Sequence, residues 1–101
     1  MKSVKEMREV VIAGVGITKW GFYEDRDWYD FGSEAILNVL KDADMEWKDI
    51  QAAFHGNCYA GVGSGHQCVK EVGLTGIPVI NVENACSSGT SALRLAYYLI
   101  G

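Results

Sequence analysis

The stretch VENACSSGTSALRLA, residues 82–96, decides the fold of this chain because its hydrophobic pattern changes within a few residues. It overlaps the end of a short apolar run, VINVE (residues 79–83), and continues into a run with apolar residues at helical spacing. Between the two runs stands Cys86, followed by two serines and a glycine. The stretch therefore predicts a strand that turns directly into a helix, with a thiol at the corner.

The same alternation of strand-type and helix-type runs occurs upstream. We expect strands at residues 9–16, 50–54 and 79–83, and helices at residues 31–43, 66–73 and 87–99. Ser33 or Asp30 is the expected cap of the first helix. The order β-α-β-α-β-α indicates an α/β fold with a parallel sheet covered on both faces. Apolar residues occupy much of the circumference of the last helix, so we expect it to be deeply buried.

Composition limits the classes of function. The 101 residues are 49% hydrophobic and carry a net charge of −4, which suits one small globular unit and gives no basic stripe for nucleic acid. No apolar run approaches the roughly 20 residues of a membrane span. The three cysteines are odd in number and imply no disulfide framework, so we expect a cytoplasmic chain with reduced thiols.

Two interpretations of Cys86 follow from its place in the pattern. At a helix start, free backbone N–H groups and the helix dipole favour a thiolate and can also hold the oxyanion of a thioester under attack. Full activation of such a nucleophile usually needs a nearby base. Alternatively, Cys86 is an ordinary buried thiol, because free cysteine is among the most buried residue types. The residues alone leave both interpretations open.

Two weaker motifs carry other chemistry. His55, Cys58, His66 and Cys68 are possible zinc ligands, but their spacing fits no common structural zinc site. We therefore expect no metal, with the two cysteines as packing residues and the histidines in loops or at helix ends with local hydrogen bonds. The segment GVGITKWG (residues 14–21) is glycine-rich like a dinucleotide loop, but its third glycine comes too late.

Three segments together resemble the thiolase family. REVVIAGVGITKWG (residues 8–21) is similar to its opening strand and loop, and residues 34–61 are similar to its first helix, acidic link and second strand. GLTGIPVINVENACSSGTSALRLA (residues 73–96) resembles the nucleophile segment of its sterol-carrier and lipid-transfer branch. The resemblance runs nearly without gaps from Val10 to Leu99.

The resemblance implies the five-layer α/β/α/β/α fold of two similar halves, with residues 1–101 as the front of the first, N-terminal domain and the remainder absent. It also implies an acyltransferase of lipid metabolism in which Cys86 accepts the acyl group of a 3-ketoacyl-CoA. Asn84 and Gly89 are supporting positions of the motif. Coenzyme A is then a substrate, and no cofactor is expected.

The same resemblance implies that the activating histidine, the second cysteine and the oxyanion site come from later segments. None of the other histidines and cysteines matches those positions, so we expect this chain alone to be inactive. A homodimer or larger assembly is expected. Open alternatives are a ketoacyl or hydroxymethylglutaryl-CoA synthase relative, a retro-aldolase working with an OB-fold, zinc-ribbon partner, and an inactive scaffold.

Overall fold

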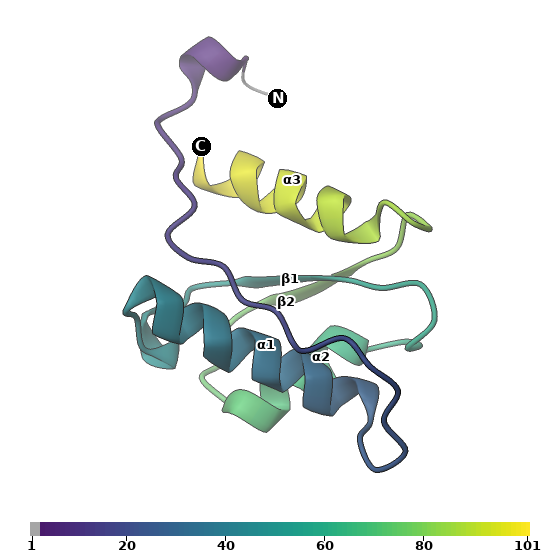
Figure 1. Ribbon diagram of the computed structural model, residues 1–101. Coiled ribbons are helices and arrows are strands. Elements are labelled where there is room, and N and C mark those ends of the chain that lie inside the picture. The colour runs from purple at the N-terminus through teal and green to yellow at the C-terminus, as the bar shows by residue number, and fades with distance from the viewer. Residues whose placement is uncertain (1–2) are drawn as a thin grey trace.

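Three α-helices and a two-stranded parallel sheet make up the fold of the computed structural model, which describes residues 3–101 (Figure 1). Two short 3-10 helices lie before and after the first α-helix. In chain order the elements are η1 (Val4–Glu6), α1 (Trp28–Ala43), η2 (Trp47–Asp49), β1 (Ala53–Gly56), α2 (Ser64–Val72), β2 (Val79–Val82) and α3 (Ser88–Ile100).

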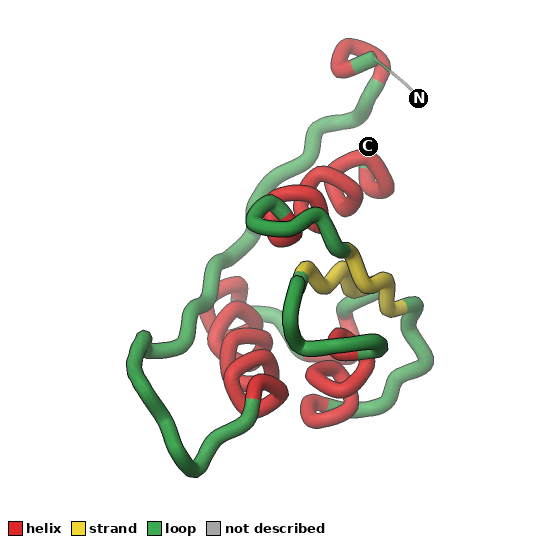
Figure 2. The backbone as a smooth tube through the Cα atoms, turned by 90° about the vertical axis from the view of Figure 1, so that its right-hand side faces the viewer, coloured by secondary structure: helices red, strands yellow, loops and turns green. Residues whose placement is uncertain are grey.

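The sheet is parallel and has helices on both faces, as predicted. β1 and β2 pair in register from Ala53 with Val79 to Gly56 with Val82. α3 lies over one face and packs against β1, while α1 and α2 pack together on the opposite side (Figures 1 and 2). The described residues therefore form an α/β unit in three layers, helix, sheet and helix pair.

Residues 9–16 do not form the predicted strand. The segment runs as an extended loop from η1 past α3 and then beside α1 (Figure 1). Val11 and Ile12 are 70% and 72% exposed, and the backbone N–H of Val15 donates to the carboxylate of Asp42 at 2.8 Å. A strand needs a neighbour for its backbone ladder, and the two strands of the described part pair with each other. The observed order of the main elements is α-β-α-β-α.

The glycines of this segment serve close packing on α1. A Cβ at Gly14 would come within 2.8 Å of Ala43, and one at Gly16 within 2.5 Å of the backbone N of Val39. A glycine lets the two backbones approach where a side chain would clash. Close packing of this segment on α1 therefore accounts for the glycines at positions 14 and 16.

The first helix also begins earlier than predicted. It starts at Trp28 with Asp27 as its cap, and the Asp30 carboxylate accepts a hydrogen bond from the Asp27 N–H at 2.9 Å. Asp30 is therefore the third residue of the helix, and neither it nor Ser33 is the cap. The reciprocal contact between the cap and the third residue of the helix stabilises this earlier start.

The described residues cover the last helix, expected to be deeply buried, on one side only. Within α3, Ser88 and Ala92 are buried, but Leu93 and Leu99 are 59% and 63% exposed. The sheet covers one side of the helix, and no other described element packs across its far side in Figure 2. None of the described helices is long and apolar enough to cross a bilayer.

Candidate functional site

The turn between β2 and α3 places Cys86 on the surface. β2 ends at Val82 and α3 begins at Ser88, so Cys86 lies in the corner that the sequence predicts. Cys86 is exposed among the described residues. The preceding residue, Ala85, has a left-handed backbone with φ of 48°, a conformation that costs a non-glycine residue free energy.

Ser88 holds this turn against the start of the helix. Its side chain is buried, and its Oγ accepts a hydrogen bond from the N–H of Asn84 at 2.8 Å and donates one to the carbonyl of Ala85 at 2.8 Å. The N–H of Ser88 donates to the same carbonyl at 3.3 Å. Sequence reasoning missed this role, although a serine at a helix start is a known signal for local backbone bonding.

The two supporting positions of the motif differ in what surrounds them. The side-chain amide of Asn84 donates to the Oγ of Ser91 at 2.9 Å, which ties the turn to the first turn of α3. A Cβ built at Gly89 would meet nothing within 4 Å. Asn84 therefore braces the corner, whereas Gly89 leaves open space beside the helix start.

The end of β1 forms the other side of the corner. A Cβ at Gly56 would come within 2.5 Å of the backbone of Ser88, so only glycine fits there without displacement. The next N–H, that of Asn57, donates to the carbonyl of Val82 at 3.1 Å. Gly56 is a residue that sequence reasoning missed, because the helix that it contacts lies more than thirty positions along the chain.

Cys58 follows directly and is not the packing residue that was expected. It is exposed, and its thiol donates to the carbonyl of Ala85 at 3.0 Å. The glycine-rich loop that contains it leaves β1 at the level of the β2–α3 turn, so its side chain meets that turn and not the core. The structure thus brings Cys58 to the backbone beside Cys86.

The remaining candidate ligands lie in separate places. Cys68 is buried where α2 crosses Gly32 of α1, and this burial raises the pKa of its thiol, which confirms it as a packing residue. His66 lies on α2, where its Nδ1 is 3.0 Å from the Nδ2 of Asn81 in β2, a contact between two elements in place of the local hydrogen bond that was expected. The described residues contain no group of three or more His, Cys, Asp or Glu side chains that could bind a metal ion.

His55 departs from its prediction. It lies inside β1 and is half-buried, where it was expected in a loop or at a helix end. A Cβ at Gly65 of α2 would come within 2.6 Å of the His55 Cβ, so the side chain packs under the start of that helix. Burial lowers the pKa of the His55 imidazole, because an apolar surrounding disfavours its charged form.

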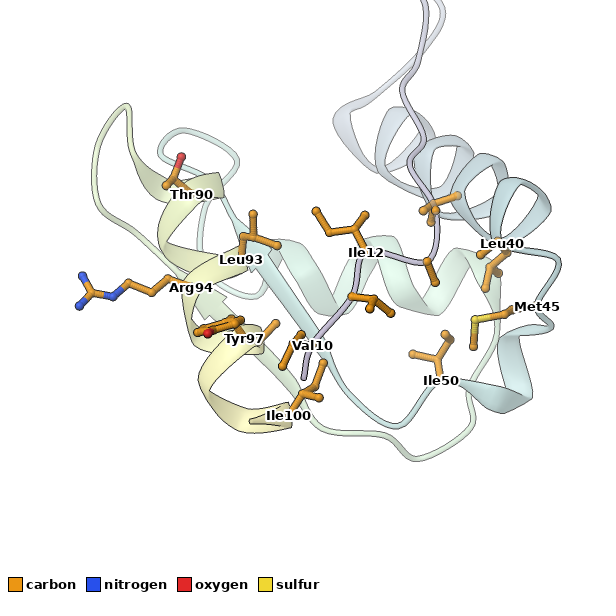
Figure 3. Close-up of a pocket in the computed structure, with 16 residues that line it drawn as sticks. Val10, Ile12, Leu40, Met45, Ile50, Thr90, Leu93, Arg94, Tyr97 and Ile100 are labelled. Atoms are coloured by element: carbon orange, nitrogen blue, oxygen red, sulfur yellow. The ribbon is translucent and has the colours of Figure 1, made fainter. Parts of the chain in front are cut away.

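A second feature of the surface is an apolar cavity of about 620 Å³ along α3 (Figure 3). Leu93, Tyr97 and Ile100 line it on the α3 side, and Leu40, Met45 and Ile50 line it opposite. Residues 10–14 cross between the two walls. Thr90, in the first turn of α3, also lines the cavity, and so does the segment at residues 10–14 that has no strand partner.

Known proteins similar to this chain are named either as lipid-transfer and sterol carrier proteins or as thiolases. No protein-family model matches the chain. It is 43% identical over 95 residues to the non-specific lipid-transfer protein-like 2 of Caenorhabditis elegans, and 40% identical over 94 residues to sterol carrier protein 2 of Bos taurus. It is also 41% identical over 95 residues to a benzoylsuccinyl-CoA thiolase subunit of Thauera aromatica. The chain is thus similar both to a thiolase subunit and to lipid-transfer and sterol carrier proteins.

The alignments cover nearly the whole chain but a small part of each relative. They include 91%, 90% and 92% of this chain, and 23%, 17% and 24% of the three relatives in the same order. The chain therefore spans about a fifth of the length of these curated relatives. The family resemblance seen in the residues around Cys86 is confirmed.

Proposed function

We propose that the chain carries the acyl-accepting nucleophile, Cys86, of a thiolase-type acyl-CoA C-acyltransferase. The observation that carries the proposal is the exposure of Cys86 at the head of α3, directly after the left-handed residue Ala85. Strained backbone that is held by surrounding bonds is typical of functional sites. The name of the related benzoylsuccinyl-CoA thiolase subunit supports the same chemistry.

The proposed reaction has two acyl transfers. The Cys86 thiolate attacks the 3-keto carbon of a 3-ketoacyl-CoA, and the bond between C2 and C3 breaks. C2 takes a proton and leaves as acetyl-CoA or its analogue, while the acyl group stays on sulfur as a thioester. The thiolate of coenzyme A then attacks that thioester and releases the new acyl-CoA. A sulfur nucleophile suits both steps because it attacks well and leaves well.

The residues of this chain contribute position and polarity to these steps. The N–H of Ser88 donates to the carbonyl of Ala85, and the dipole of α3 favours negative charge near the helix start. Ser88 and Asn84 fix the turn so that Cys86 stays next to the helix start. Gly89 leaves space there for an acyl group.

The base that activates Cys86 is proposed to come from another part of the full-length protein. His66 bonds to Asn81, and His55 lies within β1 under α2. We propose likewise that the second cysteine and the oxyanion residues lie outside this chain, that the full-length protein is a homodimer or larger, and that it works in the cytoplasm. The share of each relative that the chain spans leaves most of their length for such residues.

A cleavage assay on the full-length protein tests the reaction type. We expect coenzyme A-dependent consumption of a 3-ketoacyl-CoA, and loss of that activity in Cys86→Ala. Cleavage of a 3-hydroxyacyl-CoA without added coenzyme A, retained in Cys86→Ala, would contradict the proposal. That result would favour the retro-aldolase that works with an OB-fold, zinc-ribbon partner.

A second candidate function is carriage of a lipid or acyl chain without chemistry. The cavity along α3 favours it, and so do the names of the related lipid-transfer and sterol carrier proteins. Leu93 lines the cavity and Leu99 does not, although both are exposed on α3. Leu93→Arg should then weaken binding of a fluorescent fatty acid, with Leu99→Arg as the matched control. Equal binding by the two variants would remove this candidate.

A further inference from the structure

We propose that Cys58 is a positioning residue for Cys86, acting through the carbonyl of Ala85. The inference rests on the proposed function, because it concerns how the same nucleophile is held. Nothing in the sequence motif around Cys86 includes position 58, which lies 28 residues earlier. The contact is visible only after β1 and β2 pair.

The carbonyl of Ala85 is the shared acceptor of three hydrogen bonds. It accepts hydrogen bonds from the Oγ of Ser88 at 2.8 Å, from the thiol of Cys58 at 3.0 Å and from the N–H of Ser88 at 3.3 Å. Two of these donors belong to the helix that follows the turn. Cys58 supplies the one donor of the three that comes from another element, so it fixes the turn relative to the sheet.

The conformation of Ala85 explains why such a donor matters. A left-handed residue with a side chain persists where several bonds over-determine it. The carbonyl that these bonds hold belongs to the peptide bond between Ala85 and Cys86. Turning of that planar peptide group, through ψ of Ala85 and φ of Cys86, changes the direction in which the Cys86 side chain leaves the backbone.

The position of Cys58 is itself fixed by the fold. Gly56 brings the end of β1 against the backbone of Ser88, and the N–H of Asn57 continues the pairing by donating to Val82. Cys58 is the next residue, so these two contacts fix the position of its backbone beside the turn. Its thiol is exposed, and its hydrogen bond to the carbonyl of Ala85 helps to hold the turn between β2 and α3.

The test compares three variants of the full-length protein: Cys58→Ser, Cys58→Ala and Cys58→Val. Serine retains a donor, whereas alanine and valine lose it, and valine keeps approximately the bulk of the thiol. Two rates are measured at residue 86 by peptide mass spectrometry: alkylation by iodoacetamide, and acylation by a 3-ketoacyl-CoA. Circular dichroism and the thermal midpoint of each variant report whether it is folded.

We expect both rates at Cys86 to fall by about threefold or more in the alanine and valine variants, and to stay within about twofold of the wild type in the serine variant. The effect should appear in kcat with little change in KM. Equal rates in all three variants would overturn the proposal, and so would equal losses in all three, since serine then fails to rescue.

The two proposals fail in different ways. If Cys86 of the wild type is alkylated but never acylated, the thiolase chemistry is wrong, while the alkylation rates still decide the role of Cys58. If Cys86 is acylated at the same rate in every Cys58 variant, the chemistry stands and the positioning role is wrong.

Discussion

The buried Oγ of Ser88 accepts a hydrogen bond from the backbone N–H of Asn84 at 2.8 Å, so the first residue of α3 holds the turn that contains the candidate nucleophile. The same hydroxyl donates a hydrogen bond to the carbonyl of Ala85 at 2.8 Å. One small side chain thus bonds both the N–H of Asn84 and the carbonyl of Ala85, the residue with the left-handed backbone. The turn between β2 and α3 is therefore held in place by the first residue of α3.

Replacing Ser88 with alanine should cost about 1 to 2 kcal/mol of unfolding free energy. The substitution removes two hydrogen bonds and leaves the Asn84 N–H without its partner. Urea unfolding measures the loss, and Ser87→Ala is the control because Ser87 is exposed one residue earlier. A loss no larger in Ser88→Ala than in Ser87→Ala would show that the hydroxyl does not hold the turn.

Gly56→Ala and Gly89→Ala should have opposite effects on stability. The new Cβ at position 56 would come within 2.5 Å of the Ser88 backbone, so β1 and α3 must separate at a cost of about 1 to 3 kcal/mol. At position 89 it meets open space within a helix, where alanine is favoured over glycine by up to about 1 kcal/mol. Thermal unfolding of the two variants provides the comparison, and equal midpoints would contradict the close approach.

Much of the architecture was accessible from the sequence because it depends on local patterns. The alternation of runs located β1, β2 and all three helices to within a few residues, and the change of period at Glu83 located the corner at Cys86. The strand expected at residues 9–16 has the right composition but lacks a partner among the described residues. A pattern of apolar residues shows what can be a strand, and pairing decides whether it is one.

The side chains that organise the corner were harder to foresee. Gly56 and Cys58 act on backbone that is about thirty positions later in the chain, so no short motif contains both sides of the contact. Ser88 lies within the motif, but its burial depends on the approach of β1. Cys86 itself was placed correctly because its position follows from the order of the elements alone.

Stability should fall on acidification in a way that depends on His55. Its pKa is lowered by burial, so the unfolded chain binds a proton that the folded chain does not as the pH falls below 6.5. The loss grows between this ordinary value and the lower folded value and then levels off. We expect His55→Asn to reduce the drop in thermal midpoint between pH 7 and pH 5, and an unchanged drop would argue against a lowered pKa of this half-buried imidazole.

The three cysteines should differ in their accessibility to alkylation. Cys58 and Cys86 are exposed, whereas Cys68 is 2% exposed and its thiol pKa is raised by burial. Brief treatment of the folded protein with iodoacetamide should therefore label positions 58 and 86 and spare position 68, as peptide mapping would show. Labelling of Cys68 as fast as the other two in the folded protein would contradict the packing of α1 on α2.

The central claim, that Cys86 accepts an acyl group, has a direct test in the mass of the protein itself. Full-length protein is incubated with a 3-ketoacyl-CoA in the absence of free coenzyme A, and its intact mass and its peptides are measured. We expect one added acyl group, located on Cys86, absent from Cys86→Ser and removed by coenzyme A. A protein that cleaves the substrate while its Cys86 peptide keeps its unmodified mass throughout would contradict the claim.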